Sequence, residues 1–160
     1  MKRLTVTKAR GVRLPVSERL LGEALDLWQN RIAIPGFSVS LDVTKDAAIK
    51  RLNARYRKKN SATDVLSFPH FEFRSPEKIK GIAGIHFLGD IVISIDTCRR
   101  QALEIGHSES EEFLRLFVHG FLHLCGYDHE VSAAQERKMF RKEDELLALF
   151  ESHTKRKKKP

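Results

Sequence analysis

Alternating apolar and polar residues, together with one long apolar run, predict four β-strands in the first two thirds of the chain. The clearest covers residues 37–44, where Phe, Val and Leu alternate with Ser, Asp and Thr. This period-2 pattern is typical of a strand with one buried face. Shorter strands are expected at 4–8 and 65–68. The Ile- and Val-rich run 82–94 is expected as a central strand, and its Gly89-Asp90 pair indicates a bulge or bend.

Apolar residues at helical spacing predict five helices. In chain order these begin after Ser17, cover 46–57 and 96–105, begin after Ser108, and run from Ser132 to Phe150. The last two start with capping boxes, Ser108 with Glu111 and Ser132 with Gln135. Strands concentrate early and helices late, which predicts the α+β class: a single compact domain with one mixed sheet of about four strands packed with about five helices.

One of these helices carries a histidine motif, HGFLHLCGYDH at 119–129. His119 and His123 are four residues apart, so their imidazoles project from one face of a helix. Gly126 can end that helix in a left-handed conformation and reverse the chain. The reversal would bring His129 back as a third ligand. Three imidazoles and an open fourth position are typical of a catalytic zinc site.

The alternative for this motif is a pair of ordinary helical histidines, because HxxxH alone is common. The added Gly and third His favour the metal site. The helix is also apolar nearly all round, so it should be buried. Histidines on a buried helix need a polar partner, and a metal ion is one.

Composition narrows the function classes. The chain has 160 residues, 41% of them hydrophobic, and a net charge of +8. Residues 1–150 are expected to form the one domain, and 151–160 a basic, disordered tail. The positive charge favours a polyanionic partner, nucleic acid before membrane. Neither a membrane span nor a secretory signal is expected. Two cysteines are too few for a disulfide framework, which favours a reducing cytoplasm.

Four sequence blocks together resemble one known family. They are LNxxYR at 52–57, TDVLSFP at 63–69, LGDIVIS at 88–94 and HGFLHLCGYDH at 119–129. In this order they resemble the YbeY endoribonucleases, also called ribosomal RNA maturation factors. The resemblance extends from about residue 40 to residue 145.

The resemblance implies a compact α+β domain with one divalent metal ion, Zn²⁺ by expectation, on His119, His123 and His129. It implies cleavage of single-stranded RNA in maturation of the 16S ribosomal RNA 3′ end and in ribosome quality control. The expected partners are ribosomal RNA and the small ribosomal subunit or its associated proteins. The resemblance also assigns Arg57 to the position of the family's functional arginine.

The chemistry of these residues suits phosphodiester cleavage. A zinc ion polarises a phosphoryl oxygen or lowers the pKa of a bound water. The Arg57 guanidinium can meet phosphate charge with two parallel hydrogen bonds. Asp128 precedes His129 and is a candidate to orient a ligand histidine, with turn formation as the equal alternative. No general base is evident, so metal-bound hydroxide, the RNA 2′-hydroxyl and a distant carboxylate all stay open.

Two other functions deserve comparison. The spacing H-x3-H-x2-G-x2-H also occurs in metzincin proteases, which carry a general-base Glu directly after the first His. Here that position is Gly120, which cannot transfer a proton. The third possibility is a non-catalytic, metal-stabilised ribosome-assembly module. The open coordination position argues against it, because structural zinc sites usually have four protein ligands.

Overall fold

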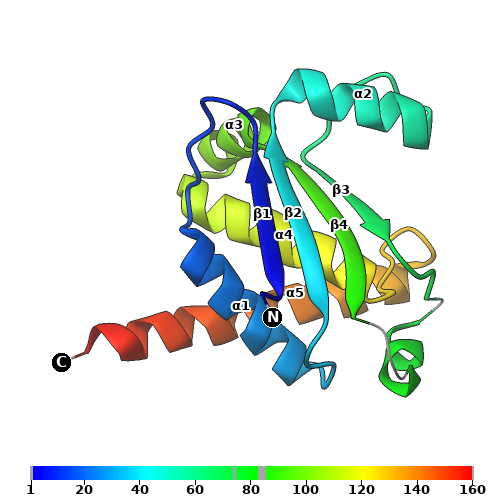
Figure 1. The fold of residues 1–160 in the computed structure, drawn as a ribbon, viewed down its shortest axis with the longest axis vertical. Helices are drawn as coiled ribbons and strands as arrows, with labels where there is room; N and C mark the ends of the chain where they lie inside the picture. The colour runs from blue at the N-terminus through cyan, green and yellow to red at the C-terminus, as the bar shows by residue number, and fades with distance from the viewer. Residues whose placement is uncertain (1, 74, 83–85, 160) are drawn as a thin grey trace.

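Four strands form one mixed sheet in the computed structural model, which describes residues 2–73, 75–82 and 86–159. The strands are β1 (Leu4–Lys8), β2 (Ser38–Thr44), β3 (Val65–Pro69) and β4 (Phe87–Ser94). Their order across the sheet is β1-β2-β4-β3. β2 pairs in parallel with β1 and β4, whereas the edge strand β3 runs antiparallel to β4 (Figure 1).

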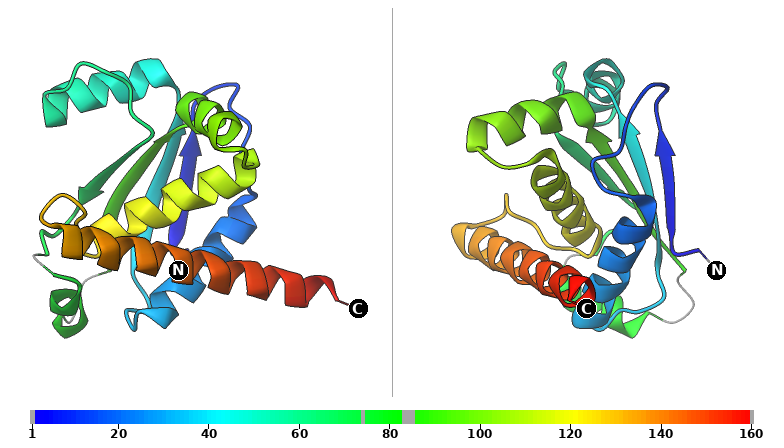
Figure 2. Two further views of the ribbon diagram at one scale, coloured as in Figure 1. Left: turned by 180° about the vertical axis from the view of Figure 1, so that it is seen from behind. Right: turned by 90° about the vertical axis from the view of Figure 1, so that its left-hand side faces the viewer.

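The described residues also form five α-helices. They are α1 (Glu18–Arg31), α2 (Asp46–Arg57), α3 (Ile95–Ile105), α4 (Glu109–Leu124) and α5 (Ala133–Lys158). α4 crosses one face of the sheet and contacts β3 and β4, and α5 packs against the outer side of α4 (Figure 2). α2 lies toward the opposite face, near the carboxyl ends of the parallel strands β1, β2 and β4 (Figure 1). Among the described residues, no helix is both long and apolar enough to cross a bilayer.

The α+β fold expected from the sequence is therefore confirmed. β4 is central, and its residues are buried on both faces: Ile91 and Ile93 join the main core under α4, and Val92 joins a smaller cluster with Ile49 and Leu66 under α2. The bulge predicted at Gly89 is present as a register shift, because Ser38 pairs with Phe87 while the next residue, Val39, pairs with Gly89.

Two segments differ from the sequence predictions. The strand expected at 82–94 begins at Phe87, and residues 83–85 lie outside the described part of the chain. The connection at 70–81, where the sequence pattern predicted no helix, contains a 3-10 helix, η1 (Pro76–Gly81). A proline at the first position of η1 favours this local structure because its φ angle is already helical.

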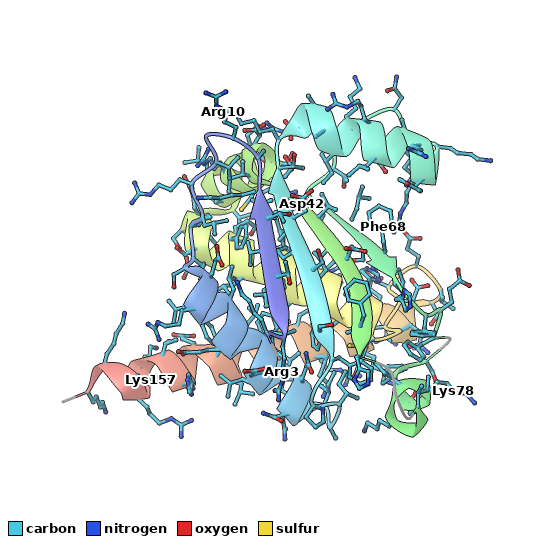
Figure 3. All side chains as sticks on the ribbon, in the orientation of Figure 1. Arg3, Arg10, Asp42, Phe68, Lys78 and Lys157 are labelled. Atoms are coloured by element: carbon cyan, nitrogen blue, oxygen red, sulfur yellow. The ribbon has the colours of Figure 1, made fainter. Side chains whose placement is uncertain are left out.

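The carboxyl end also differs from expectation, because α5 continues to Lys158 where a disordered tail was predicted from residue 151. Glu23 of α1 anchors this extension: it pairs with Lys157 at 3.1 Å and with His153 at 3.6 Å. Figure 3 labels Lys157 near the end of the helix. The basic residues of the last turn also interact favourably with the negative end of the helix dipole. The basic residues that were expected in a disordered tail are therefore part of α5.

Gly120 lets α4 approach the sheet closely. A Cβ at this position would lie 2.8 Å from Ile91 Cγ2 and 3.3 Å from both Ser67 Oγ and Val65 Cγ2. The Ser67 hydroxyl also donates to the Gly120 carbonyl at 3.2 Å. The helix that carries two of the three histidines is therefore held at a fixed height above β3 and β4.

Gly120→Ala should lower the free energy of unfolding by about 1–3 kcal/mol, because overpacking a tight core site is destabilising. Urea denaturation followed by circular dichroism measures this change. Gly22→Ala is the matched control, since a Cβ there meets nothing within 4 Å in a helix interior. The control should be neutral or stabilising. Equal stability of the two variants would contradict the close approach.

Candidate metal centre

The last two turns of α4 place two of the histidines side by side. His119 Nε2 and His123 Nε2 lie 3.0 Å apart, as expected for residues at i and i+4. His129 Nδ1 lies 3.1 Å from His123 Nε2. One ring nitrogen from each histidine falls within 4.8 Å of the others. The three imidazoles predicted from the sequence therefore converge at one point and could hold a metal ion.

A glycine turn brings His129 back toward the helix. Gly126 has a φ of +92°, and the N–H groups of Gly126 and Tyr127 donate to the carbonyls of His123 and Leu122. This pair of bonds is the Schellman ending of a helix. A Cβ on Gly126 would also lie 2.9 Å from Phe73 Cβ. Both the backbone angle and the lack of space therefore require glycine here.

The hydrogen-bond partners fix which nitrogens face the centre. His123 Nδ1 lies 3.0 Å from the Tyr127 carbonyl, which can only accept, so Nδ1 carries the proton. His119 Nδ1 pairs in the same way with the Glu143 carboxylate. In the neutral form of both rings, the two Nε2 atoms then face each other with lone pairs. Facing lone pairs repel, and a bound cation removes that repulsion.

Distances and protonation also fit a metal ion. Nitrogens at about 2.0–2.1 Å from a tetrahedral zinc stand roughly 3.3 Å apart, close to the separations of 3.0 and 3.1 Å between these rings. Burial, with His119 and His129 alongside, lowers the pKa of His123 to about 4. The ring is therefore neutral at pH 7 and its lone pair is free to bind a cation.

Glu143 is a further candidate site residue, which the sequence patterns did not identify. It is 5% exposed and lies on the buried face of α5 with Met139, Leu146 and Phe150. A carboxylate at helical spacing among core residues is buried and therefore needs a polar partner. That spacing is the feature of the sequence from which Glu143 could have been identified. A carboxylate behind a ligand histidine orients the ring and raises its basicity.

Glu143→Gln should weaken metal binding by about 10- to 100-fold, the usual effect of removing such a partner. Gln keeps the shape but replaces the carboxylate by a neutral amide. Competition with a fluorescent zinc chelator measures the affinity. Asp144→Asn, an exposed neighbour on α5, is the control and should bind zinc normally. Unchanged affinity in Glu143→Gln would refute this role.

The other predicted residues fall in two places. Asp128 points into its own turn, where its carboxylate accepts from the Glu130 N–H at 2.8 Å. Arg57, the last residue of α2, is exposed and lines the cleft beside the histidines. The structure thus brings Arg57 to the same cleft as the histidines. The carboxylate that contacts a histidine of the centre is that of Glu143, whereas Asp128 bonds to its own turn.

The cleft has two adjoining parts around the metal centre. One has a volume of about 220 Å³ and the other about 360 Å³. Both are lined by Arg57, Ser67, His123, His129 and Glu130. The first extends toward Phe73 and Tyr127, the second toward Arg115 and Phe140. The histidines therefore border an open groove with room for an extended ligand on each side.

A family comparison decides the identity of this arrangement. The family model described as Endoribonuclease YbeY matches residues 7–151. The chain belongs to the YbeY family. This assignment confirms the resemblance drawn from the four sequence blocks, and the matched region contains the three histidines, Arg57 and Glu143.

Individual relatives agree with the YbeY assignment. The Endoribonuclease YbeY of Persephonella marina is 37% identical over 153 residues, 96% of this chain and 95% of the relative. That of Leptospira interrogans is 48% identical over 122 residues, 71% of this chain and 86% of the relative. A Thermotoga maritima protein of known solution structure has a similar fold, with a TM-score of 0.62 and 24% identity over 99% of this chain and 94% of that one.

Neither comparison nor geometry supports the protease alternative. The position after His119 is Gly120, and a glutamate there would push its Cβ against Ile91. YbeY membership and this packing agree that the metzincin base is absent.

Proposed function

We propose that this YbeY-family protein is a metal-dependent endoribonuclease. It cleaves single-stranded RNA in the maturation of the 16S ribosomal RNA 3′ end and in ribosome quality control. The observation that carries the proposal is the convergence of three histidine nitrogens beside a groove that also holds an exposed arginine. Family membership indicates the reaction, and the site supplies the groups that it needs.

The proposed cofactor is one divalent metal ion, zinc, on His119, His123 and His129. Imidazole ligands suit zinc, and three of them would leave a fourth coordination position for water or substrate. When bound, the ion supplies Lewis acidity to a phosphoryl oxygen. Glu143 and the Tyr127 carbonyl keep the rings oriented for it.

Arg57 is proposed to bind the scissile phosphate. It lines both parts of the groove, so its guanidinium borders the path of a strand that passes the histidines. A planar guanidinium donates two parallel hydrogen bonds to a phosphate, and these strengthen as negative charge builds on the oxygens. Arg57 therefore acts on the reacting phosphate directly.

The chemical groups at the ends of the cleaved RNA reveal which nucleophile attacks the phosphate. Attack by the RNA 2′-hydroxyl leaves a 2′,3′-cyclic phosphate, whereas attack by water leaves a linear phosphate. Among the carboxylates that line the groove, Asp64 accepts from the Val65 N–H at 2.7 Å and from the Gln101 amide at 3.2 Å. Mass spectrometry of the cleaved ends distinguishes the two routes.

Removal of the metal tests the proposal. The purified protein should cut a labelled single-stranded RNA, lose cleavage after chelation and dialysis, and regain it when zinc is added back. A duplex of the same sequence should be cut more slowly. Equal cleavage before and after metal removal, or no cleavage by the zinc-loaded protein, would contradict the proposed function.

The proposed setting is the cytoplasm, with ribosomal RNA as substrate and the small ribosomal subunit as partner. Two features of the chain support this. Cys98 and Cys125 are both free and buried, as suits a reducing compartment. The net charge of +8 favours association with a polyanion.

A further inference from the structure

The larger part of the groove has a basic lining and one unexplained aromatic ring. Arg57 and Lys59, at the end of α2, and Arg115 of α4 contribute the cations, and Phe140 of α5 contributes the ring. Asp64 and Glu130 line it as well, but Asp64 already accepts three hydrogen bonds within the protein. A basic groove with an aromatic ring is the usual composition of a single-strand nucleic-acid site.

Phe140 lies outside the core, although it is a large apolar residue. Its neighbour Met139 is fully buried, whereas Phe140 is 42% exposed. Phe140 precedes Glu143 by three residues, so both side chains lie on neighbouring turns of α5. Glu143 contacts His119. The exposed ring therefore stands beside the metal centre, in a position that the core does not require.

Arg115 is held in place on the other side of the same part of the groove. It precedes His119 by four residues, which puts it on the same side of α4. Its Nε donates to Glu112 at 3.0 Å, and its Nη2 donates to the second oxygen of that carboxylate. Glu112 is fully buried. This two-point pairing fixes the orientation of the guanidinium plane. The two N–H groups of Nη1 take no part in the pairing with Glu112.

We propose that this part of the groove is a nucleotide subsite, in which Phe140 stacks on one unpaired base next to the scissile phosphate and Arg115 and Lys59 bind the adjoining backbone. The inference rests on the proposed ribonuclease function and adds a specificity residue to it. A base inside a duplex already stacks on its neighbours and has no free face. Stacking on Phe140 therefore selects single-stranded RNA without selecting a sequence.

A combined change in protein and substrate tests the stacking directly. The RNA series carries one abasic nucleotide at each position around the mapped cut. Phe140→Ala should lower kcat/KM on intact RNA by about 5- to 100-fold, the usual effect of losing one base stack. One abasic position should cost the wild type a similar factor. Because both changes remove the same contact, their combination should give no further loss.

Controls separate stacking from general damage. Phe140→Tyr keeps a stacking ring and should retain activity within a few-fold. Leu103→Ala removes an apolar side chain that is 84% exposed on α3, outside the groove, and should behave as wild type. Full activity of Phe140→Ala on intact RNA, or losses that multiply in the combination, would overturn the subsite.

A binding measurement keeps this test distinct from the test of the ribonuclease function. Fluorescence anisotropy gives Kd for the same RNAs with Arg57→Ala protein, with and without Phe140→Ala. A wild type that cuts no RNA refutes the proposed function. The Kd values then test the subsite separately from cleavage. If Phe140→Ala and the abasic nucleotide each weaken binding and together weaken it no further, the stacking is supported. If neither change weakens binding, or if their effects multiply, the stacking is refuted.

Discussion

His123→Ala should abolish both metal binding and RNA cleavage. His123 is central among the three proposed ligands, because its Nε2 lies 3.0 Å from His119 Nε2 and 3.1 Å from His129 Nδ1. Two imidazoles that remain cannot hold zinc in the groove at neutral pH. The loss of affinity should exceed the roughly 10- to 100-fold effect of removing a partner behind a ligand. Metal analysis of the purified protein and cleavage of a labelled RNA measure the two effects.

The identically purified wild type and His153→Ala provide the comparison. His153 pairs with Glu23 far along α5, away from the groove, so its loss should leave zinc content and cleavage unchanged. This control also reveals contaminating nucleases, which would cut equally in all preparations. Cleavage by His123→Ala at the wild-type rate would remove the basis for metal-dependent catalysis. Circular dichroism confirms that the variant is folded.

Arg57→Ala should reduce kcat by about 100- to 1000-fold while zinc content stays the same. Removal of one donor that stabilises transition-state charge usually has an effect of this size. Arg57 lies at the end of α2 and takes no part in binding the metal, so the metal centre should remain intact. Arg57→Lys should recover only part of the rate, because an ammonium lacks the two-pronged geometry. Single-turnover cleavage measures kcat without product release.

Arg55→Ala separates this role from loss of surface charge. Arg55 is exposed on the same helix, and its guanidinium lies over the Tyr56 ring, outside the groove. Both variants lose one positive charge, but only Arg57 borders the histidines. Cleavage by Arg55→Ala should stay within a few-fold of wild type. If the two variants lose activity equally, Arg57 contributes general charge and no specific contact.

Local pattern was sufficient for the parts of the molecule that depend on neighbours in sequence. The alternation at 37–44 and the capping box at Ser108 predicted β2 and α4 correctly, because pleat and helix periodicity act over a few residues. The convergence of the three histidines was predictable for the same reason. One helical turn and one glycine turn bring them together within eleven residues.

Local pattern failed where a segment's environment lies elsewhere in the chain. Residues 151–158 were expected to be disordered, but contacts with Glu23 of α1 accompany a helix there. Met139 and Phe140 are adjacent apolar residues on α5, yet the neighbouring elements bury Met139 and leave Phe140 in the groove. Periodicity identifies an apolar residue, but packing of whole elements decides which direction faces the core.

The sequence by itself determined the fold class, the three convergent histidines and, through the family motifs, the kind of reaction. Only the tertiary structure placed Glu143 behind His119 and brought Arg57 and Phe140 to the same groove. These residues come from α2 and α5, whereas the first two histidines lie on α4. Their meeting depends on how helices pack across a sheet, and that packing is set by the combined shape of the core, which no single segment contains.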